Sequence, residues 1–219
     1  FKGGDRTDIE LPAVQRELIH ALHRAGKKII LVNCSGSPIA LEPETKNCEA
    51  ILQAWYPGQA GGTAVADVLF GDYNPGGRLP VTFYRNMSRL PDFEDYNMTG
   101  RTYRYMTQQP LFPFGYGLSY TTFEYGNLSL TKEQIKVGEP LKLTVNVTNN
   151  GQRDGEEVVQ VYLKKQDDAE GPGKTLRAFK RVRIPAGKSV EVAFDLNGKE
   201  LEWWDAQSNT MRVCAGRYD

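Results

Sequence analysis

The segment 100–105 carries the residues best suited to contacting a polar, ring-shaped ligand. Arg101 and Arg104 alternate with Tyr103 and Tyr105, so guanidinium groups with several N–H donors stand beside aromatic faces. Such a set can hydrogen-bond to a sugar or stack on it. The same side chains can instead lock the loop onto neighbouring aromatic residues through cation–π and backbone contacts. We favour this structural interpretation, and we take Arg101 and Tyr103 as the first candidates for a position near a substrate.

Three other chemistries are poorly supported by the residues. His20 and His23 lie three residues apart on a predicted helix, but no cluster of Cys, Asp or Glu is ready to supply the other ligands of a metal ion. Ser35 and Ser37 lack the G-x-S-x-G turn of a serine hydrolase. The glycine-rich segment 57–62 lacks both the G-x-G-x-x-G order and the P-loop lysine, which weakens a nucleotide-binding interpretation. We therefore predict no metal and no cofactor.

The tandem tryptophans Trp203 and Trp204 could form a carbohydrate-binding platform, which is the basis for an alternative function as a stand-alone carbohydrate-binding or adhesion module. In an extended segment, however, successive side chains point to opposite faces, so that one of the pair normally enters the core. We prefer core and interface packing for this pair.

The charge balance bears on the class of partner. There are 27 basic and 27 acidic residues, which gives a net charge of zero and no field that would attract nucleic acid or an anionic membrane. No apolar run reaches the roughly 18 residues of a membrane span. A neutral partner such as a sugar fits better.

The first hundred residues alternate helix-like and strand-like segments. The predicted elements are a helix at 12–25, strands at 28–34 and 50–55, and a helix at 63–70. Pro12 suits the first helical position, where its missing N–H costs least, and Gly26 and Gly71 suit the helix ends. The two apolar runs are typical of parallel strands that are covered on both faces. This half therefore predicts an α/β architecture with a mostly parallel sheet.

The second half changes to alternation of apolar and polar residues near Tyr120. The predicted strands are 141–147, 157–164, 177–184, 189–196 and 209–214. Asn149-Asn150-Gly151 predicts a hairpin-type turn after the first of them. This spacing is typical of an antiparallel β-sandwich of about a hundred residues. The connecting segment 111–120 is too aromatic for a flexible linker.

The cysteines and the chain ends give weaker indications. Cys34 lies in an apolar run and is expected to be a small buried hydrophobe. It can pair with Cys48 only if their Cα atoms come within about 7 Å. The chain starts without Met, and Tyr218-Asp219 resembles the start of a strand without a partner, so we expect a piece of a longer protein with a truncated last strand.

Four stretches, in this order, resemble segments of family-3 glycoside hydrolases. They are 4–12, with Ile9 as a departure from the pattern, 55–80, 100–105 and 113–123. The resemblance covers nearly the whole chain. It implies an α/β protein followed by an all-β one: part of an α/β-sandwich domain with a mostly parallel sheet over 1–118, and then a fibronectin type III-like antiparallel β-sandwich over 119–219.

The resemblance also implies an activity for the parent protein, the retaining hydrolysis that releases terminal β-linked glucose or xylose from oligosaccharides. In the family an N-terminal β/α barrel carries the Asp nucleophile, and the acid/base Glu lies shortly before the first matching stretch. Neither Glu10 nor Asp5 occupies that position, so we assign no catalytic residue to this chain and expect it to be inactive alone and architectural. The family further suggests a periplasmic or extracellular location.

Because the catalytic loop of the family lies just ahead of Asp5, this residue joins Arg101, Tyr103 and Arg104 as a candidate for a place near the substrate. The alternative for Asp5 and Arg6 is a turn with an ion pair that fixes the entry to the first helix. We favour the alternative.

Overall fold

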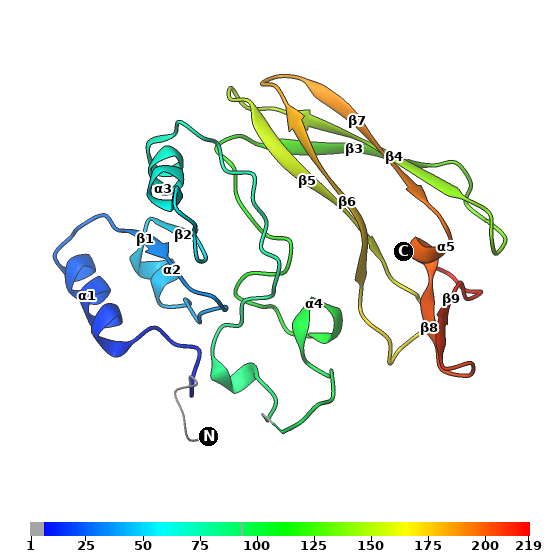
Figure 1. Ribbon diagram of the computed structural model, residues 1–219, viewed down its shortest axis with the longest axis horizontal. Helices are drawn as coiled ribbons and strands as arrows, with labels where there is room; N and C mark the ends of the chain where they lie inside the picture. The colour runs from blue at the N-terminus through cyan, green and yellow to red at the C-terminus, as the bar shows by residue number, and fades with distance from the viewer. Residues whose placement is uncertain (1–6, 93) are drawn as a thin grey trace. The chain divides into compact units, whose positions relative to one another are not determined.

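The computed structural model describes residues 7–92 and 94–219 (Figure 1). The chain divides into two compact units. The first unit runs to Asp72 and resumes at Leu79–Tyr116, and the second consists of Tyr73–Arg78 and Gly117–Asp219. The domain boundaries expected from the sequence, 1–118 and 119–219, stay a prediction. The division into units also shows that Tyr73–Arg78 associates with the second half of the chain.

The first unit is built around a pair of parallel strands. Its elements are α1 (Ala13–Arg24), β1 (Ile30–Asn33), α2 (Glu44–Asn47), β2 (Ala50–Gln53), α3 (Gly61–Phe70), the 3-10 helix η1 (Met87–Arg89) and α4 (Thr102–Tyr105). Figure 1 shows α1, α2 and α3 gathered around β1 and β2. Ile30 lies opposite Ala50 and Asn33 opposite Gln53, which confirms the predicted parallel pairing.

The ends of the two longer helices follow from single residues. α1 begins at Ala13, so Pro12 occupies the N-cap, one residue before the first helical position predicted for it, and its missing N–H still leaves no helical hydrogen bond unmade. Gly26 has a φ of 67° and Gly71 a φ of 85°, the left-handed conformation that glycine adopts without a Cβ penalty. α3 starts at Gly61, two residues before the predicted start.

The apolar stripe of α1 does not pack within the described chain. Val14, Leu18 and Leu22 are 72%, 59% and 38% exposed, although their spacing predicted the helix. Ile19 instead enters a small core that includes Leu11. The spacing thus identified the helix but not the face that packs here.

The second unit is the predicted antiparallel β-sandwich. Its elements are β3 (Phe123–Leu130), β4 (Leu141–Asn149), β5 (Gly155–Leu163), β6 (Thr175–Ile184), β7 (Ser189–Leu196), α5 (Gly198–Leu201), β8 (Trp203–Asp205) and β9 (Thr210–Arg212). The strands form the sheets β3-β4-β7, β5-β6 and β8-β9. The core between the two larger sheets contains Leu143, Val145, Val147, Val159, Ile184, Val192, Phe194 and Leu196. The alternating face predicted for 189–196 is therefore buried, while β3 was not predicted.

The predicted hairpin at Asn149-Asn150-Gly151 is wrong. β4 pairs with β3 and β7 whereas β5 pairs with β6, so the chain passes here from one sheet to the other. Asn149 is fully buried, and its Nδ2 donates to the carbonyl oxygens of Arg153 and Ile184 at 2.7 and 2.9 Å. Its Oδ1 accepts from Thr121 Oγ1 at 2.5 Å. The side-chain amide of Asn149 makes hydrogen bonds here in place of the backbone hydrogen bonds of a hairpin. The local sequence pattern does not reveal which sheet the next strand joins.

Two further expectations are also wrong. Cys34 is exposed because it follows the last residue of β1 at the open end of the strand. It is a free thiol, as is Cys48, so the two do not pair. Near the end of the chain, Tyr218 forms an antiparallel bridge with Lys165, so this segment is not an unpaired edge.

Candidate functional site

Arg101, the first candidate from the sequence, is held by the loop that precedes it. Its Nε donates to the carbonyl oxygen of Asn97 at 3.1 Å. Its Nη2 donates to the carbonyl oxygens of Asp92 and Asp95 at 3.1 and 2.5 Å. The guanidinium group therefore holds three backbone carbonyl groups of this loop, a structural role made through backbone contacts.

Tyr103 and Arg104 also make contacts within the first unit. The Tyr103 ring stacks on Phe114 with centroids 4.3 Å apart and an interplanar angle of 16°. The Arg104 guanidinium lies 5.6 Å from the centroid of the Tyr105 ring. The stacking of Tyr103 on Phe114 matches the expected lock onto the aromatic segment 111–120, whereas the Arg104 contact stays within 100–105. The proximity of these residues to a substrate stays a prediction, and Asp5 lies outside the described residues.

A cleft of about 1110 Å³ opens at the carboxyl ends of β1 and β2. Its lining comes from 7–20, from 33–39 and from Tyr56. In open α/β sheets ligands bind at the carboxyl ends of parallel strands, which makes this cleft the candidate site of the first unit. None of the candidates Arg101, Tyr103 and Arg104 lines it. The sequence feature that could have indicated this cleft is that the apolar runs of β1 and β2 each end in a polar residue, Asn33 and Gln53.

Asn33, the last residue of β1, lines this cleft and is hydrogen-bonded to Gln53, the last residue of β2. Asn33 is 6% exposed, and its Nδ2 donates to Gln53 Oε1 at 2.6 Å and to Ser35 Oγ at 3.0 Å. Ser35 Oγ donates in turn to the carbonyl oxygen of Ser37 at 2.8 Å. Both N–H groups of the Asn33 amide are thus used, and within the described chain its Oδ1 is left as an acceptor.

Arg16, which lines the cleft, is paired within the protein. Arg16 donates to Glu10 and to Glu44, each at 2.8 Å, and to the carbonyl oxygen of Ala40 at 3.0 Å. Glu44 is fully buried, and its hydrogen bond raises the pKa of Arg16 above its ordinary value. The guanidinium is therefore committed to protein carboxylates. The described lining also contains the carboxylates of Asp8, Glu10 and Glu17.

Residues 7–92 and 94–219 contain no group of three His, Cys, Asp or Glu side chains that could hold a metal ion. Within the same ranges no helix has the length and apolar character needed to cross a membrane.

The segment Tyr73–Arg78, which the sequence indicated only as a turn, carries a buried ion pair of the second unit. Arg78 Nη2 lies 2.5 Å from Glu157 Oε2, with the two side chains 11% and 9% exposed. Tyr125 donates its O–H to Glu157 Oε1 at 3.0 Å. Burial, together with this carboxylate, raises the pKa of Tyr125 far above its usual range. The carboxylate of Glu157 thus joins Arg78 and Tyr125.

A more exposed cluster lies on the same segment. Tyr73 donates its O–H to Glu156 Oε2 at 2.9 Å, and Arg181 pairs with the same carboxylate. The hydrogen bond from Tyr73 and the Arg181 charge lower the pKa of Glu156. The Arg78 cluster attaches this segment to β5 and β3, and the Tyr73 cluster attaches it to β5 and β6. No sequence motif pointed to either cluster.

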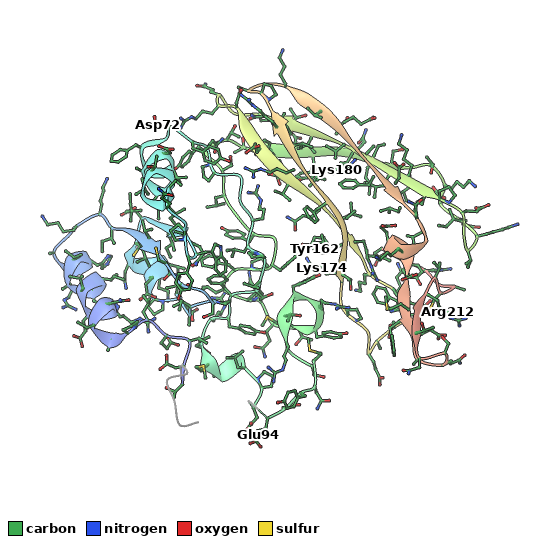
Figure 2. All side chains as sticks on the ribbon, in the orientation of Figure 1. Asp72, Glu94, Tyr162, Lys174, Lys180 and Arg212 are labelled. Atoms are coloured by element: carbon green, nitrogen blue, oxygen red, sulfur yellow. The ribbon has the colours of Figure 1, made fainter. Side chains whose placement is uncertain are left out.

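The tandem tryptophans divide between core and surface. Trp203 is 2% exposed and donates its Nε1–H to Asp168 Oδ2 at 2.6 Å, whereas Trp204 is 52% exposed. In the same unit Lys174 Nζ lies 4.5 Å from the centroid of the Tyr162 ring, and the two side chains are labelled together in Figure 2. The core position predicted for one tryptophan is confirmed. A tandem stacking platform is not formed.

Comparison with known proteins supplies the family. The model of the glycosyl hydrolase family 3 C-terminal domain matches residues 2–120, and that of the fibronectin type III-like domain matches 157–219. The whole chain aligns with a xylan 1,4-beta-xylosidase from Xylanibacter ruminicola at 58% sequence identity, and the aligned part is 25% of that protein's length. A periplasmic beta-glucosidase from Salmonella typhimurium aligns with 94% of the chain at 39% sequence identity, and the aligned part is 29% of that protein's length.

Solved structures agree with these matches. The structure of a beta-glucosidase from Erythrobacter marinus covers the whole chain with a TM-score of 0.86 and 39% identity, over 30% of its own length. A beta-D-glucoside glucohydrolase from Trichoderma reesei covers 98% of the chain with a TM-score of 0.85 and 27% identity, over 34% of its length. The chain thus spans between a quarter and about a third of these four relatives.

Proposed function

The chain belongs to glycosyl hydrolase family 3, and from this membership we propose that it is the C-terminal part of an enzyme that releases terminal β-linked xylose or glucose from oligosaccharides. The observation that carries the proposal is the 58% identity to a xylan 1,4-beta-xylosidase, which extends over all 219 residues. That protein and the beta-glucosidases among the relatives are named for the same class of bond, a β-glycosidic linkage.

We propose that the chain itself is non-catalytic and architectural. Retaining hydrolysis uses two carboxyl groups about 5–5.5 Å apart, one of which acts as an acid with a raised pKa. Four carboxyl groups of the described chain, those of Glu139, Asp154, Glu156 and Asp205, have a pKa below the ordinary value. All four are displaced downward, by hydrogen bonds and cations, and all belong to the second unit. None of these four has the raised pKa that the acid requires, which fits an acid supplied by polypeptide outside this chain.

The exposed apolar surface of the first unit supports a further partner. The α1 stripe of Val14, Leu18 and Leu22 is open to solvent, and Ile30 on β1 is 55% exposed. Parallel strands are normally covered on both faces. We assign this surface to the β/α barrel and the remainder of the α/β sandwich of the intact enzyme. A periplasmic or extracellular location is part of the proposal, and the periplasmic relative from Salmonella supports it.

A chimaeric enzyme tests the proposal. This chain would replace the matching quarter of the Xylanibacter ruminicola protein, and hydrolysis of nitrophenyl β-xyloside and nitrophenyl β-glucoside would be measured for the chimaera and for the isolated chain. We expect activity of the chimaera within tenfold of the parent enzyme and no turnover by the chain alone. A folded but inactive chimaera, or turnover by the isolated chain, would refute the proposal.

A further inference from the structure

We propose that Arg104 binds a carboxylate supplied by the N-terminal part of the intact enzyme, and so forms a docking point for polypeptide outside this chain. The inference rests on the proposed function, which places that polypeptide in the same protein. It adds the chemistry by which one residue of the first unit recognises it, and it gives Arg104 a protein partner in place of the substrate.

The guanidinium group of Arg104 makes no hydrogen bond or ion pair with residues 7–92 and 94–219. Its Nε is buried there without an acceptor. The contact that the structure gives the group is an aromatic one, with Cζ 5.6 Å from the centroid of the Tyr105 ring. A guanidinium group is permanently charged and carries five N–H donors, so a partly buried one without an acceptor is unfavourable.

Other arginines of the first unit are paired by the fold itself. Arg16 meets two carboxylates, Arg85 pairs with Glu42 at 2.8 Å, and Arg101 holds three carbonyl oxygens. Arg104 departs from this pattern. Neither of its Nη groups is buried as its Nε is, so both can be reached by an acceptor from outside the chain.

The carboxylates nearest to Arg104 in the sequence are used elsewhere. Asp92 Oδ1 accepts from the backbone N–H of Glu94 at 3.0 Å, and Asp95 Oδ1 accepts from that of Asn97 at 2.9 Å. Both belong to the loop that Arg101 holds. The acceptor for Arg104 is therefore not supplied by this loop.

A strained backbone positions Arg104. Thr102, the first residue of α4, has a φ of 55°, which is rare for a β-branched residue and costs conformational energy. Its N–H donates to the Tyr84 hydroxyl at 2.9 Å, and its Oγ1 accepts from the backbone N–H of Arg104 at 3.3 Å. These bonds hold the turn that presents the guanidinium group. Such strain is typically retained where a side chain must be placed for a partner.

The chemistry of the group favours a carboxylate of the protein over other acceptors. A guanidinium group matches a carboxylate through two parallel hydrogen bonds. A hydroxyl group of a sugar is neutral and would leave the partly buried charge uncompensated. The exposed apolar surface of the first unit already requires cover from the same N-terminal polypeptide, so an Asp or Glu side chain from there needs no additional partner.

The main test compares the thermal unfolding of Arg104→Met in the isolated 219-residue chain and in the chimaera. In the isolated chain we expect a melting temperature that rises or stays within about 1 °C, because the lost cation has no partner there. In the chimaera we expect a fall of at least about 4 °C, because a carboxylate buried by the contact loses its cation. Arg104→Lys should lower it less, since the charge remains but the planar fork is lost.

Arg183→Met is the matched control. The Arg183 side chain is 73% exposed and pairs with Asp154 of the same chain. The same change of charge at this position should therefore have a small and equal effect in the isolated chain and in the chimaera.

A second measurement needs only the isolated chain. The Nε–H resonances of its arginines are followed by NMR during a titration with sodium acetate, with sodium chloride at equal ionic strength as the reference. The Arg104 resonance should shift with acetate and not with chloride. The Arg16 resonance should respond to neither, because Arg16 Nε already donates to Glu44 at 2.8 Å.

Three results would overturn the inference: an equal fall in melting temperature of Arg104→Met in both proteins, no fall in the chimaera, or an acetate response of Arg104 no larger than that of Arg16. A raised KM of the Arg104→Met chimaera without a fall in melting temperature would assign Arg104 to the substrate instead. None of the deciding measurements requires hydrolysis by the unmodified chimaera. An inactive chimaera would thus refute the proposed function and leave this test in force.

Discussion

At the scale of single residues, Arg101 shows how a side chain with obvious binding chemistry can be used by its own loop. The sequence marks it as a hydrogen-bond donor between aromatic residues. The structure directs its guanidinium to the carbonyl oxygens of Asp92, Asp95 and Asn97. Hydrogen bonds from a charged group contribute more than neutral ones, and a carbonyl oxygen left unpaired is costly.

Arg101→Ala should therefore lower the free energy of unfolding by about 1–3 kcal/mol, because three carbonyl oxygens lose a charged donor. Urea unfolding followed by circular dichroism measures the loss. Arg101→Lys should recover less than half of it, since an ammonium group lacks the planar fork that reaches all three oxygens. Unchanged stability of the alanine variant, combined with a raised KM in the chimaera, would favour contact with the substrate instead.

At the scale of elements, the start of α3 depends on the absence of one side chain. Gly61 donates its N–H to the carbonyl oxygen of Gly58 at 2.9 Å and lies against Pro57. A Cβ on Gly61 would lie 2.4 Å from Pro57 Cβ, and the rigid proline ring cannot rotate away. The neighbouring Gly62 has nothing within 4 Å of such an atom.

These two glycines form a matched pair for mutation. Gly61→Ala should destabilise the chain by about 1–3 kcal/mol through overpacking. Gly62→Ala should be neutral or stabilise the chain by up to about 1 kcal/mol, because it restricts the unfolded chain without a clash. Thermal unfolding of both variants in parallel tests this. Equal melting temperatures would contradict the role given to the contact with Pro57.

At the scale of the whole molecule, the segment Tyr73–Arg78 belongs to a different unit from the residues that flank it in the sequence. It follows α3 in the sequence but belongs to the second unit, to which Arg78 and Tyr73 attach it through Glu157 and Glu156. The Arg78 pair is buried, in contrast to the pair of Arg183 with Asp154, whose side chains are 73% and 49% exposed.

Removing the buried cation should be far more costly than removing the exposed one. Arg78→Met leaves Glu157 buried without its cation and should cost about 3–5 kcal/mol of unfolding free energy. Arg183→Met should cost less than about 1 kcal/mol, since solvent screens the exposed pair. Urea unfolding of the two variants at the same ionic strength gives the comparison. Equal losses would mean that burial does not set the strength of the Arg78 pair.

Much of the architecture was predictable from the sequence, because it depends on neighbouring residues. Pro12, Gly26 and Gly71 set helix ends through their own backbone preferences. The alternation over 189–196 gave β7 and its buried face. Order and spacing of the motifs identified the family.

Only the tertiary structure decided which of the candidate residues meet. The amide of Asn33 and that of Gln53 are 20 residues apart, and Arg78 and Glu157 are 79 apart, so each pairing depends on strand register and packing. Local sequence patterns encode backbone preference and periodicity, whereas a binding surface arises from side chains that distant segments bring together.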